Sequence, residues 1–484
     1  MNQSDSYDLT PREISLVEKL LQEAQVAREK ADAAQEKARA ALSMLVQSRD
    51  LDEGSDWNYN GGKLRRVDRG QQAAAPAAAE PLVEERPPVP VPLPQAPRLV
   101  LDALAARDCN DAERAIELAA RAIAEGDRGS SSHIIQASCL GDLRRHGEAL
   151  QVIEAGLKVC PPEEVPNLVN ERAFQEILSG DPDLWQDGWR DWESRPQRRD
   201  LARNLAAAWP EIKEWSGERD RVVLVCCDKG LGDTVLFARY LRVLTDRGCT
   251  LQLNCSRAST PFADAARGRP GVLGAYGSDA QIPKMAEHWI ALESLVQHSE
   301  ERIPAPYDLG PRWEPRPLDG RRPRVGLCWH GAVGYAAAKR RRPEDRALWD
   351  SLAAVEGIDF VSLQLGELGP CSEELPAGSS VMDAARIACG CDLVISVDTS
   401  SAHIAATCGV PTLVPLMRLN YWPWLSVSGD GARTPWYSSM RMFRQSKGEE
   451  WSWTFGRIKA ELRKLFKLDP PTTASRKKVA RRAK

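Results

Sequence analysis

Two short stretches of the chain carry polar side chains at points where a strand should give way to a helix. The first is Gly230-Leu231-Gly232-Asp233-Thr234, which follows the apolar run RVVLVCC and precedes TVLFARYLRVL. Glycines there allow a tight turn and a close approach of a ligand to the backbone. The start of the helix offers free N–H groups to a phosphate or a carboxylate. Asp233 is therefore a candidate general base, and a carboxylate that only caps the helix is the alternative.

The second stretch follows the apolar run DLVIS. It combines one carboxylate, three hydroxyls and one imidazole, which belong to Asp398, Thr399, Ser400, Ser401 and His403. Hydroxyls and backbone N–H groups at a helix start can hold a diphosphate. His403 lies in the first predicted turn, and a buried histidine bonded to the backbone is the alternative there. This stretch predicts an anion site more specifically than the first one does.

A third group of polar residues lies between these two stretches. His330 and Gly331 follow a strand-like run, and Lys339 and Arg340 open a run of four basic residues. On a loop that faces a cleft, such cations bind phosphate, and arginine does so through two parallel hydrogen bonds. On an open face they are only solvated. We take all four as candidate phosphate ligands.

Other nucleotide-binding patterns fit the first stretch poorly. A dinucleotide fold would have a third glycine in place of Val235, and an acid near the position of Asn254. A Walker-type phosphate loop would need a Lys-Ser or Lys-Thr pair after the glycines, and this chain has neither. An NAD-dependent oxidoreductase is therefore the weakest of the function classes considered.

Residues 220–315 and 320–466 each alternate strand-like and helical runs. Continuous apolar runs such as RVVLVCC are typical of parallel strands that are buried on both faces. We predict an α/β fold with an N-terminal and a C-terminal lobe, joined near residues 315–323. Ligands of such sheets bind at the carboxyl ends of the strands. The cleft between the lobes is therefore the expected site.

Residues 98–195 are predicted to be helical with an internal repeat. DAERAIELAARAIAEGD aligns with RHGEALQVIEAGLKVCP at an offset of 34 residues. This is the period of tetratricopeptide (TPR) repeats, which are helix pairs, and a general helical bundle is the alternative. A short stack needs support, so we expect Trp185, Trp189 and Trp192 to pack against the next domain.

The remaining segments lie towards the two ends of the chain. Residues 10–47 show a heptad pattern of apolar residues and predict a coiled-coil helix, with a lone surface helix as the alternative. The pattern leaves its partner open, and self-association is one of the options. The Pro/Ala-rich residues 48–97 predict an extended linker, or a ligand for a PxxP-binding domain. The basic residues 470–484 predict a disordered, solvated tail, with contact to RNA or an anionic membrane as the alternative.

The composition excludes several classes of protein. Lys and Arg number 65 and Asp and Glu 68 in 484 residues, so the net charge of −3 argues against a dedicated nucleic-acid binder. No apolar run reaches the roughly 18 residues of a membrane span, and the start of the chain lacks the pattern of a secretory signal. The 12 cysteines show no paired zinc-binding spacing. We expect a cytoplasmic protein with reduced cysteines and no metal.

The chain resembles bacterial TPR-linked glycosyltransferases of the ADP-heptose:lipopolysaccharide heptosyltransferase-like superfamily. The resemblance rests on GLGDTVLFARYL, SVDTSSAHIAATCGVPTLV and PWYSSMRMFRQ, and it covers residues 98–466. It implies a GT-B fold, which is a pair of Rossmann-like lobes, with the acceptor on the first lobe and the nucleotide-sugar donor on the second. It also implies that the C-terminal helix, residues 453–466, crosses back to the first lobe.

The resemblance further implies an inverting, metal-independent transfer of a hexosyl or heptosyl group, with no cofactor besides the donor substrate. Asp233 would accept a proton from the acceptor hydroxyl. The residues that would bind the donor are Gly230, Gly232, Thr234, His330, Gly331, Lys339, Arg340, Asp398, Thr399, Ser400, Ser401 and His403. In the family a polar residue often follows the Trp-x-Gly stretch, where this chain has Ala332.

Two function classes follow from these residues. The first is a glycosyltransferase whose TPR-like repeats recruit a protein or saccharide acceptor. The second is a non-catalytic coiled-coil and TPR adaptor with a degenerate transferase domain, because a fold alone does not establish activity. Loss of turnover on replacement of Asp233 would separate the two.

Overall fold

The computed structural model describes residues 6–8, 57–60, 63–66, 95–109, 111–278, 280–331, 342–343, 345–418, 424–426 and 431–468. The chain divides into two compact units, Met1–Pro90 and Val91–Lys484. The predicted coiled coil at 10–47 and the predicted basic tail at 470–484 lie outside the described residues. Among the described residues, no helix is long and apolar enough to span a bilayer.

The first unit contains a small antiparallel sheet. Its strands are β1 (Ser6–Asp8), β2 (Trp57–Asn60) and β3 (Lys63–Arg66), in the order β1-β3-β2. Two of these strands lie within 48–97, where we expected only an extended linker. The sequence WNYNGGKLRR explains the difference, since aromatic residues favour strands and a Gly-Gly pair favours a tight turn.

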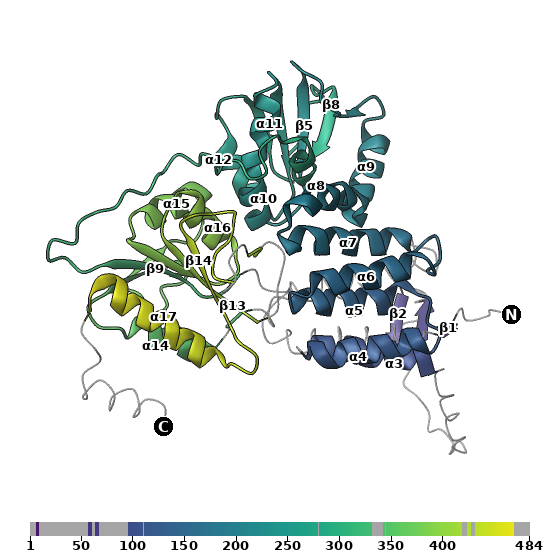
Figure 1. Cartoon of the computed structure of the whole chain (residues 1–484). Helices are drawn as coiled ribbons and strands as arrows, with labels where there is room; N and C mark the ends of the chain where they lie inside the picture. Colours follow the sequence, from purple (N-terminus) through teal and green to yellow (C-terminus); the bar gives the residue numbers. More distant parts are fainter. Residues whose placement is uncertain are drawn as a thin grey trace, which may run out of the picture. The chain divides into compact units, whose positions relative to one another are not determined.

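The second unit begins with six helices that pack in series, which we call the helical array (Figure 1). They are α3 (Gln95–Asp108), α4 (Ala112–Ala124), α5 (Ser130–Asp142), α6 (His146–Leu157), α7 (Val165–Ser179) and α8 (Pro182–Asp191). α4 and α6 begin 34 residues apart, and both bury an alanine, Ala115 and Ala149, completely. Small side chains at these points let neighbouring helices approach closely.

The first lobe is built on a parallel sheet with the strand order β4-β8-β5-β6-β7. The strands are β4 (Lys213–Glu214), β5 (Val222–Cys227), β6 (Thr250–Cys255), β7 (Val272–Tyr276) and β8 (His288–Ala291). The short helices α10 (Leu231–Phe237), η3 (Ala238–Leu241), α12 (Thr260–Ala266) and η4 (Leu292–His298) follow its strands. Another helix, α9 (Pro196–Ala208), precedes the sheet.

The second lobe is a parallel sheet with the order β11-β10-β9-β12-β13-β14. The strands are β9 (Arg324–Cys328), β10 (Asp359–Leu365), β11 (Glu373–Leu375), β12 (Leu393–Ser396), β13 (Thr412–Leu416) and β14 (Met440–Arg444). The helices are α14 (Arg346–Ala353), α15 (Val381–Cys389), α16 (Ser400–Thr407) and α17 (Trp451–Phe466). The two sheets confirm the predicted mixed α/β architecture.

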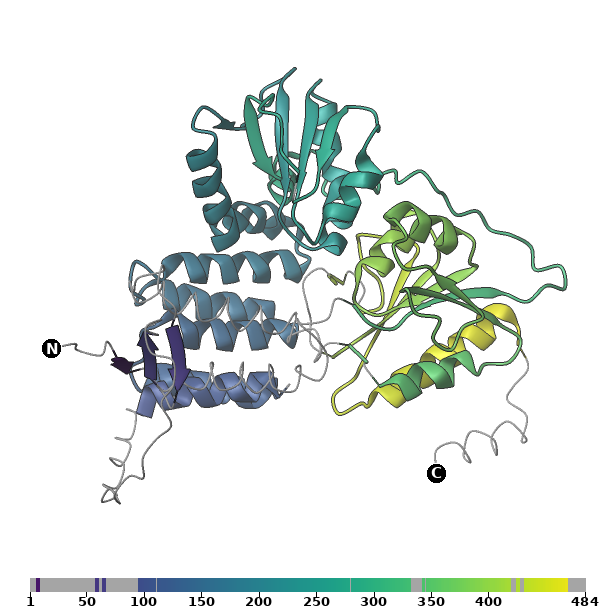
Figure 2. The same cartoon turned by 180° about the vertical axis from the view of Figure 1, so that it is seen from behind.

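The C-terminal helix α17 differs from its prediction. We expected it to cross back to the first lobe, whereas it packs on α14, β13 and β14 of the second lobe (Figure 1). Its apolar stripe of Phe455, Ile458 and Leu462 explains this, because all three side chains are buried in the core of that lobe. Residues 299–323 join the lobes without forming a helix or a strand (Figure 2).

The helical array contacts both lobes. Trp185, Trp189 and Trp192 are buried, and Trp189 packs edge-on against Phe237 of the first lobe with ring centroids 5.5 Å apart. Trp185 lies 5.8 Å from the ring of Trp436 in the second lobe. These indoles belong to the same apolar core as the two sheets. The expected packing of the three tryptophans on the next domain is therefore present.

A second contact joins the other end of the array to the second lobe. Glu113 of α4 accepts hydrogen bonds from Arg418 at 3.0 Å and from Lys447 at 2.7 Å. These two bonds lower the pKa of Glu113 to about 2. The array thus contacts the second lobe at α4 and at α8.

Candidate functional site

The first glycine turn connects β5 to α10. Gly230 caps the helix in an extended conformation, and the Thr234 hydroxyl donates to the Gly230 carbonyl at 3.0 Å. Thr234 is 1% exposed, so its hydroxyl serves the turn itself. Asp233 lies in the first turn of α10 and is half-buried. The structure thus places the candidate base directly after the carboxyl end of a central strand.

The second stretch connects β12 to α16. Thr399 is the N-cap residue of α16, and its side chain makes no capping hydrogen bond. Asp398 is buried, and its carbonyl accepts from Arg342 Nε at 2.8 Å. Burial raises the pKa of the neighbouring Cys328 thiol, and a hydrogen bond with the Ser401 hydroxyl opposes that rise. The first turn of α16 therefore has backbone N–H groups that the side chain of its cap residue does not occupy.

The two predicted motifs meet in the structure. α10 and α16 pack against each other at their first turns. A Cβ atom added to Gly232 would lie 3.0 Å from Cδ2 of His403 and 3.5 Å from Cα of Ser400. Only a glycine permits this approach without displacing the histidine ring. Asp233 is the next residue along the chain, so it stands at the contact between the two lobes.

His403 fills this contact as a neutral side chain. It is 2% exposed, its ring stacks on Trp424 with centroids 4.9 Å apart, and its Nδ1 lies 3.2 Å from the Tyr437 hydroxyl. Burial and the Arg239 guanidinium lower the pKa of His403 from 6.5 to about 3. It therefore offers no positive charge to a diphosphate at neutral pH. Its ring packs the second lobe onto Gly232.

Carboxylates gather at the carboxyl edge of the first sheet. β5 and β8 pair in parallel with Cys226 opposite Ala291, so Asp228 and Glu293 each stand two residues beyond this pair. Burial raises the pKa of Glu293 to about 8, and the charges of Asp228 and Asp233 contribute to the rise.

A buried arginine opposes that rise only weakly. Arg195 approaches Glu293 at 3.5 Å but is already paired with Glu193 at 2.9 Å. Glu293 is thus mainly protonated at neutral pH, and it adds no full negative charge beside Asp233.

His330 and Gly331 lie on the second lobe, at the end of β9. His330 Nε2 lies 2.7 Å from Glu367, and the backbone N–H of His330 donates to the Gln364 side chain. A Cβ on Gly331 would lie 2.5 Å from Nη1 of Arg342, so this glycine makes room for the guanidinium. Arg342 therefore links the loop after β9 to the Asp398 carbonyl.

The structure thus forms two groups from the predicted residues. One contains Gly230, Gly232, Asp233, Ser400 and His403, at the contact of α10 with α16. The other contains His330, Gly331 and Asp398, connected through Arg342. Lys339 and Arg340 lie outside the described residues and stay predictions.

The sequence analysis did not single out several residues that shape these groups, namely Glu293, Gln364, Trp424 and Tyr437. Gln364 had a usable signal, because it is a polar residue within an apolar strand. No spacing or residue type pointed to the packing of Trp424 and Tyr437 around His403.

Comparisons with known proteins give structural likenesses only. No family model and no curated protein matches the sequence. The solved structures that resemble this chain include the bacterial iron-containing dodecameric glycosyltransferase TibC from enterotoxigenic E. coli H10407, at 12% identity and a TM-score of 0.33. That match covers 42% of this chain and 59% of TibC, so the chain spans less than two thirds of the length of TibC.

Two other similar structures are transferases. E. coli ADP-heptose lps heptosyltransferase II is 14% identical with a TM-score of 0.34, and the match covers 50% of this chain and 98% of that one. The Thermobaculum terrenum O-GlcNAc transferase is 12% identical with a TM-score of 0.21, and the match covers 66% and 82% of the two chains. With these TM-scores, the likenesses do not show membership in a family.

One expectation is corrected by these comparisons. We expected no cofactor and no metal, whereas the similar structure of TibC is described as iron-containing. Within the part of this chain that the structure describes, no group of three or more His, Cys, Asp and Glu side chains is arranged to hold a metal ion. The residues present there do not fit an iron centre.

Proposed function

We propose that this chain is a glycosyltransferase that moves a sugar from a nucleotide-sugar donor to an acceptor hydroxyl with inversion. The observation that carries the proposal is the contact of Gly232 with His403 and Ser400. It joins a carboxylate on one lobe to an uncapped helix start on the other. The two lobes are then a GT-B-like pair, with the acceptor on the first and the donor on the second.

In the proposed chemistry, the first turn of α10 supplies the base and the first turn of α16 holds the leaving group. Asp233 accepts the proton of the acceptor hydroxyl as that oxygen attacks the anomeric carbon. The bond from this carbon to the diphosphate oxygen breaks at the same time. The departing diphosphate is held by the N–H groups of the first turn of α16 and by the hydroxyls of Thr399 and Ser400.

We assign the helical array to acceptor binding and interpret it as TPR-like. The 34-residue offset between α4 and α6 supports this interpretation. The array ends next to the first glycine turn, because the Lys229 ammonium lies 5.9 Å from the ring centroid of Trp192. A protein or saccharide bound along the array would thus have its reactive hydroxyl close to Asp233. The heptosyl specificity, the bacterial origin and the cytoplasmic location stay predictions.

The experiment is a calorimetric titration of the full chain with UDP-, GDP-, ADP- and CMP-sugars, followed by an assay of sugar release with the sugar that binds. We expect one nucleotide class to bind. Asp233→Asn should keep that affinity within about twofold and lose turnover by about 10²- to 10⁴-fold, the usual contribution of a general base. The matched control is Asp264→Asn, which removes an exposed carboxylate of the same lobe whose ion pair, among the described residues, is with Arg267 at 3.0 Å.

Two results would contradict the proposal. If no nucleotide sugar binds, the lobes do not form a donor site, and the non-catalytic adaptor becomes the better interpretation. If Asp233→Asn turns over as fast as Asp264→Asn, Asp233 is not the base.

A further inference from the structure

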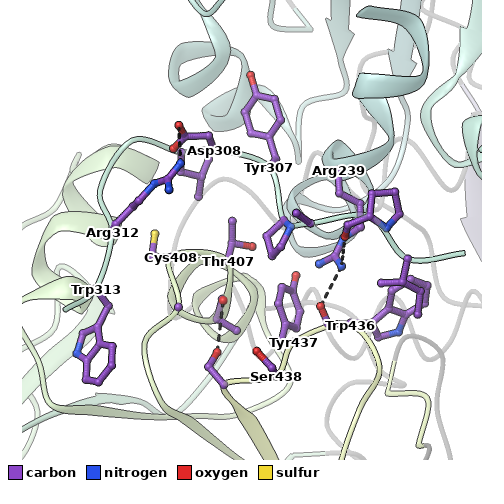
Figure 3. A pocket seen from close by; sticks show the side chains of 18 of the residues that line it. Arg239, Tyr307, Asp308, Arg312, Trp313, Thr407, Cys408, Trp436, Tyr437 and Ser438 are labelled. Atoms are coloured by element: carbon purple, nitrogen blue, oxygen red, sulfur yellow. Dashed lines mark hydrogen bonds and ion pairs between the residues drawn. The ribbon is translucent and has the colours of Figure 1, made fainter. Parts of the chain in front are cut away.

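A pocket lies at the C-terminal end of α16, the opposite end from its first turn, and Figure 3 shows the side chains that line it. Its volume is about 550 Å³. It is lined by Arg239 of the first lobe, by residues 303–309 and 311–313 of the segment that joins the lobes, and by residues 406–409 and 435–439 of the second lobe. None of the residues of the two predicted motifs lines it. The pocket is therefore distinct from the candidate donor site.

Arg239 brings a buried positive charge to this pocket. It is 3% exposed, and its guanidinium donates to the carbonyls of Leu236, Pro304 and Trp436 at 2.9, 3.2 and 2.9 Å. Among the residues that the structure describes, no carboxylate lies at ion-pair distance from it. A buried charge is costly when no opposite charge compensates it. The rings of Trp436 and Tyr437 lie 5.7 and 4.9 Å from the guanidinium carbon. The carbonyls and these rings thus stabilise the charge in part, and no carboxylate of the described residues neutralises it.

The other charged groups of the pocket cancel each other. Arg312 donates to Asp308 at 3.4 Å, so this pair contributes no net charge. The titratable side chains of the lining besides these are Tyr307, Tyr437 and Cys408. Burial raises the pKa of both tyrosines, and a hydrogen bond with Cys389 together with burial raises the pKa of Cys408. All three are neutral at pH 7. The lining therefore carries one net positive charge, which matches a monoanion.

The walls of the pocket are aromatic. Tyr307 and Trp313 are half-buried, and Trp436 and Tyr437 are buried (Figure 3). The Trp436 ring packs on Trp185 and on Phe237, with centroids 5.8 and 5.9 Å apart, so that wall of the pocket is held in place from behind. The volume falls within the range of about 300–1,000 Å³ that small-molecule sites usually occupy.

We propose that this pocket binds a small aromatic carboxylate, with the carboxylate on Arg239 and the ring among the four aromatic side chains. The ligand would contact both lobes and the segment that joins them. Tyr437 also bonds to His403, which packs on Gly232. Through Tyr437 and His403, a ligand in the pocket would therefore affect the contact between α10 and α16.

The test compares 4-iodobenzoate with the neutral 4-iodobenzamide, which has a similar shape. Each is titrated into the full chain at pH 7 by calorimetry. We expect the carboxylate to bind at least tenfold more tightly than the amide. Crystals soaked in 4-iodobenzoate should show the anomalous signal of iodine between Tyr307, Trp436 and Tyr437. Equal affinities, or an iodine position outside the pocket, would overturn the proposal.

Variants separate the charge of Arg239 from its packing. Arg239→Gln should reduce the affinity for 4-iodobenzoate at least tenfold and leave the affinity for the amide unchanged. The matched control is Arg247→Gln, because Arg247 also donates to carbonyls and stacks on a tryptophan, Trp215, outside this pocket. If Arg239→Gln does not fold, the comparison of the two compounds on the unmodified chain and the iodine position still decide the question.

Discussion

Gly232→Ala tests directly whether the two first turns meet as described. The new Cβ would lie 3.0 Å from Cδ2 of His403, whereas carbon atoms in contact normally lie about 3.5–4.0 Å apart. The histidine ring is held by Trp424, which stacks on it with centroids 4.9 Å apart, and by the Tyr437 hydroxyl, 3.2 Å from its Nδ1. We therefore expect relief of the overlap to move α10 away from α16.

The magnitude follows from two opposing effects. Inserting a methyl group into a closely packed interior costs about 1–3 kcal/mol. Replacing a glycine by alanine within a helix gains about 0.5–1 kcal/mol. We expect Gly232→Ala to lower the free energy of unfolding by about 0–2.5 kcal/mol. Because the movement separates Asp233 from the first turn of α16, turnover should fall much more than stability does.

The matched control is Gly147→Ala. Gly147 is the second residue of α6, as Gly232 is of α10, and a Cβ on Gly147 would meet nothing within 4 Å. The free energies of unfolding of the two variants, measured in urea, should differ by the packing cost alone, about 1–3 kcal/mol. Sugar transfer should be normal in Gly147→Ala and reduced in Gly232→Ala. If both variants gain stability equally and retain activity, the contact between the motifs is refuted.

Three further predictions concern stability and pH. Because the pKa of Glu293 rises from 4.5 to about 8 on folding, its contribution to stability is present below pH 4.5 and is lost as the pH rises to 8. The free energy of unfolding of the unmodified chain, measured in urea, should therefore fall relative to that of Glu293→Gln as the pH rises from 4.5 to 8. The fall should be at most about 5 kcal/mol, at about 1.4 kcal/mol per pKa unit. The contribution of His403 to stability changes with pH in the opposite direction. Its pKa is lowered from 6.5 to about 3, so the free energy of unfolding falls as the pH drops from 6.5 towards 3. Its ring resonances should not shift between pH 8 and pH 5, and a midpoint near 6.5 would contradict its burial. Gly188→Ala should destabilise the chain by about 1–2 kcal/mol in urea unfolding, because the new Cβ would lie 2.8 Å from Cγ1 and 3.2 Å from the backbone nitrogen of Ile177.

Sequence patterns predicted those features that depend on local order. The two parallel sheets were predictable because strands buried on both faces are continuous apolar runs. The turns at Gly230 and Thr399 were predictable because glycines and hydroxyl residues mark the starts of helices. Both kinds of pattern depend on a few neighbouring residues.

Apart from the packing of the three tryptophans on the next domain, individual contacts across the chain were not predictable. Nothing in the sequence shows that Gly232 lies against His403, 171 positions away. The burial that makes His403 neutral comes from Trp424 and Tyr437, which belong to a different part of the chain. The position of α17 was predicted wrongly from the resemblance to a GT-B fold, because its buried Phe455, Ile458 and Leu462 pack within the second lobe.

The helical array contacts the second lobe at both of its ends, through Glu113 on α4 and through Trp185 on α8. It also contacts the first lobe through Trp189. The angle between the lobes and the curvature of the array are therefore mechanically coupled. A molecule that straightens or bends the array must change how the lobes close, and its binding energy is shared between the two motions. By reciprocity, whatever closes the lobes changes the affinity of the array for its partner by the same factor.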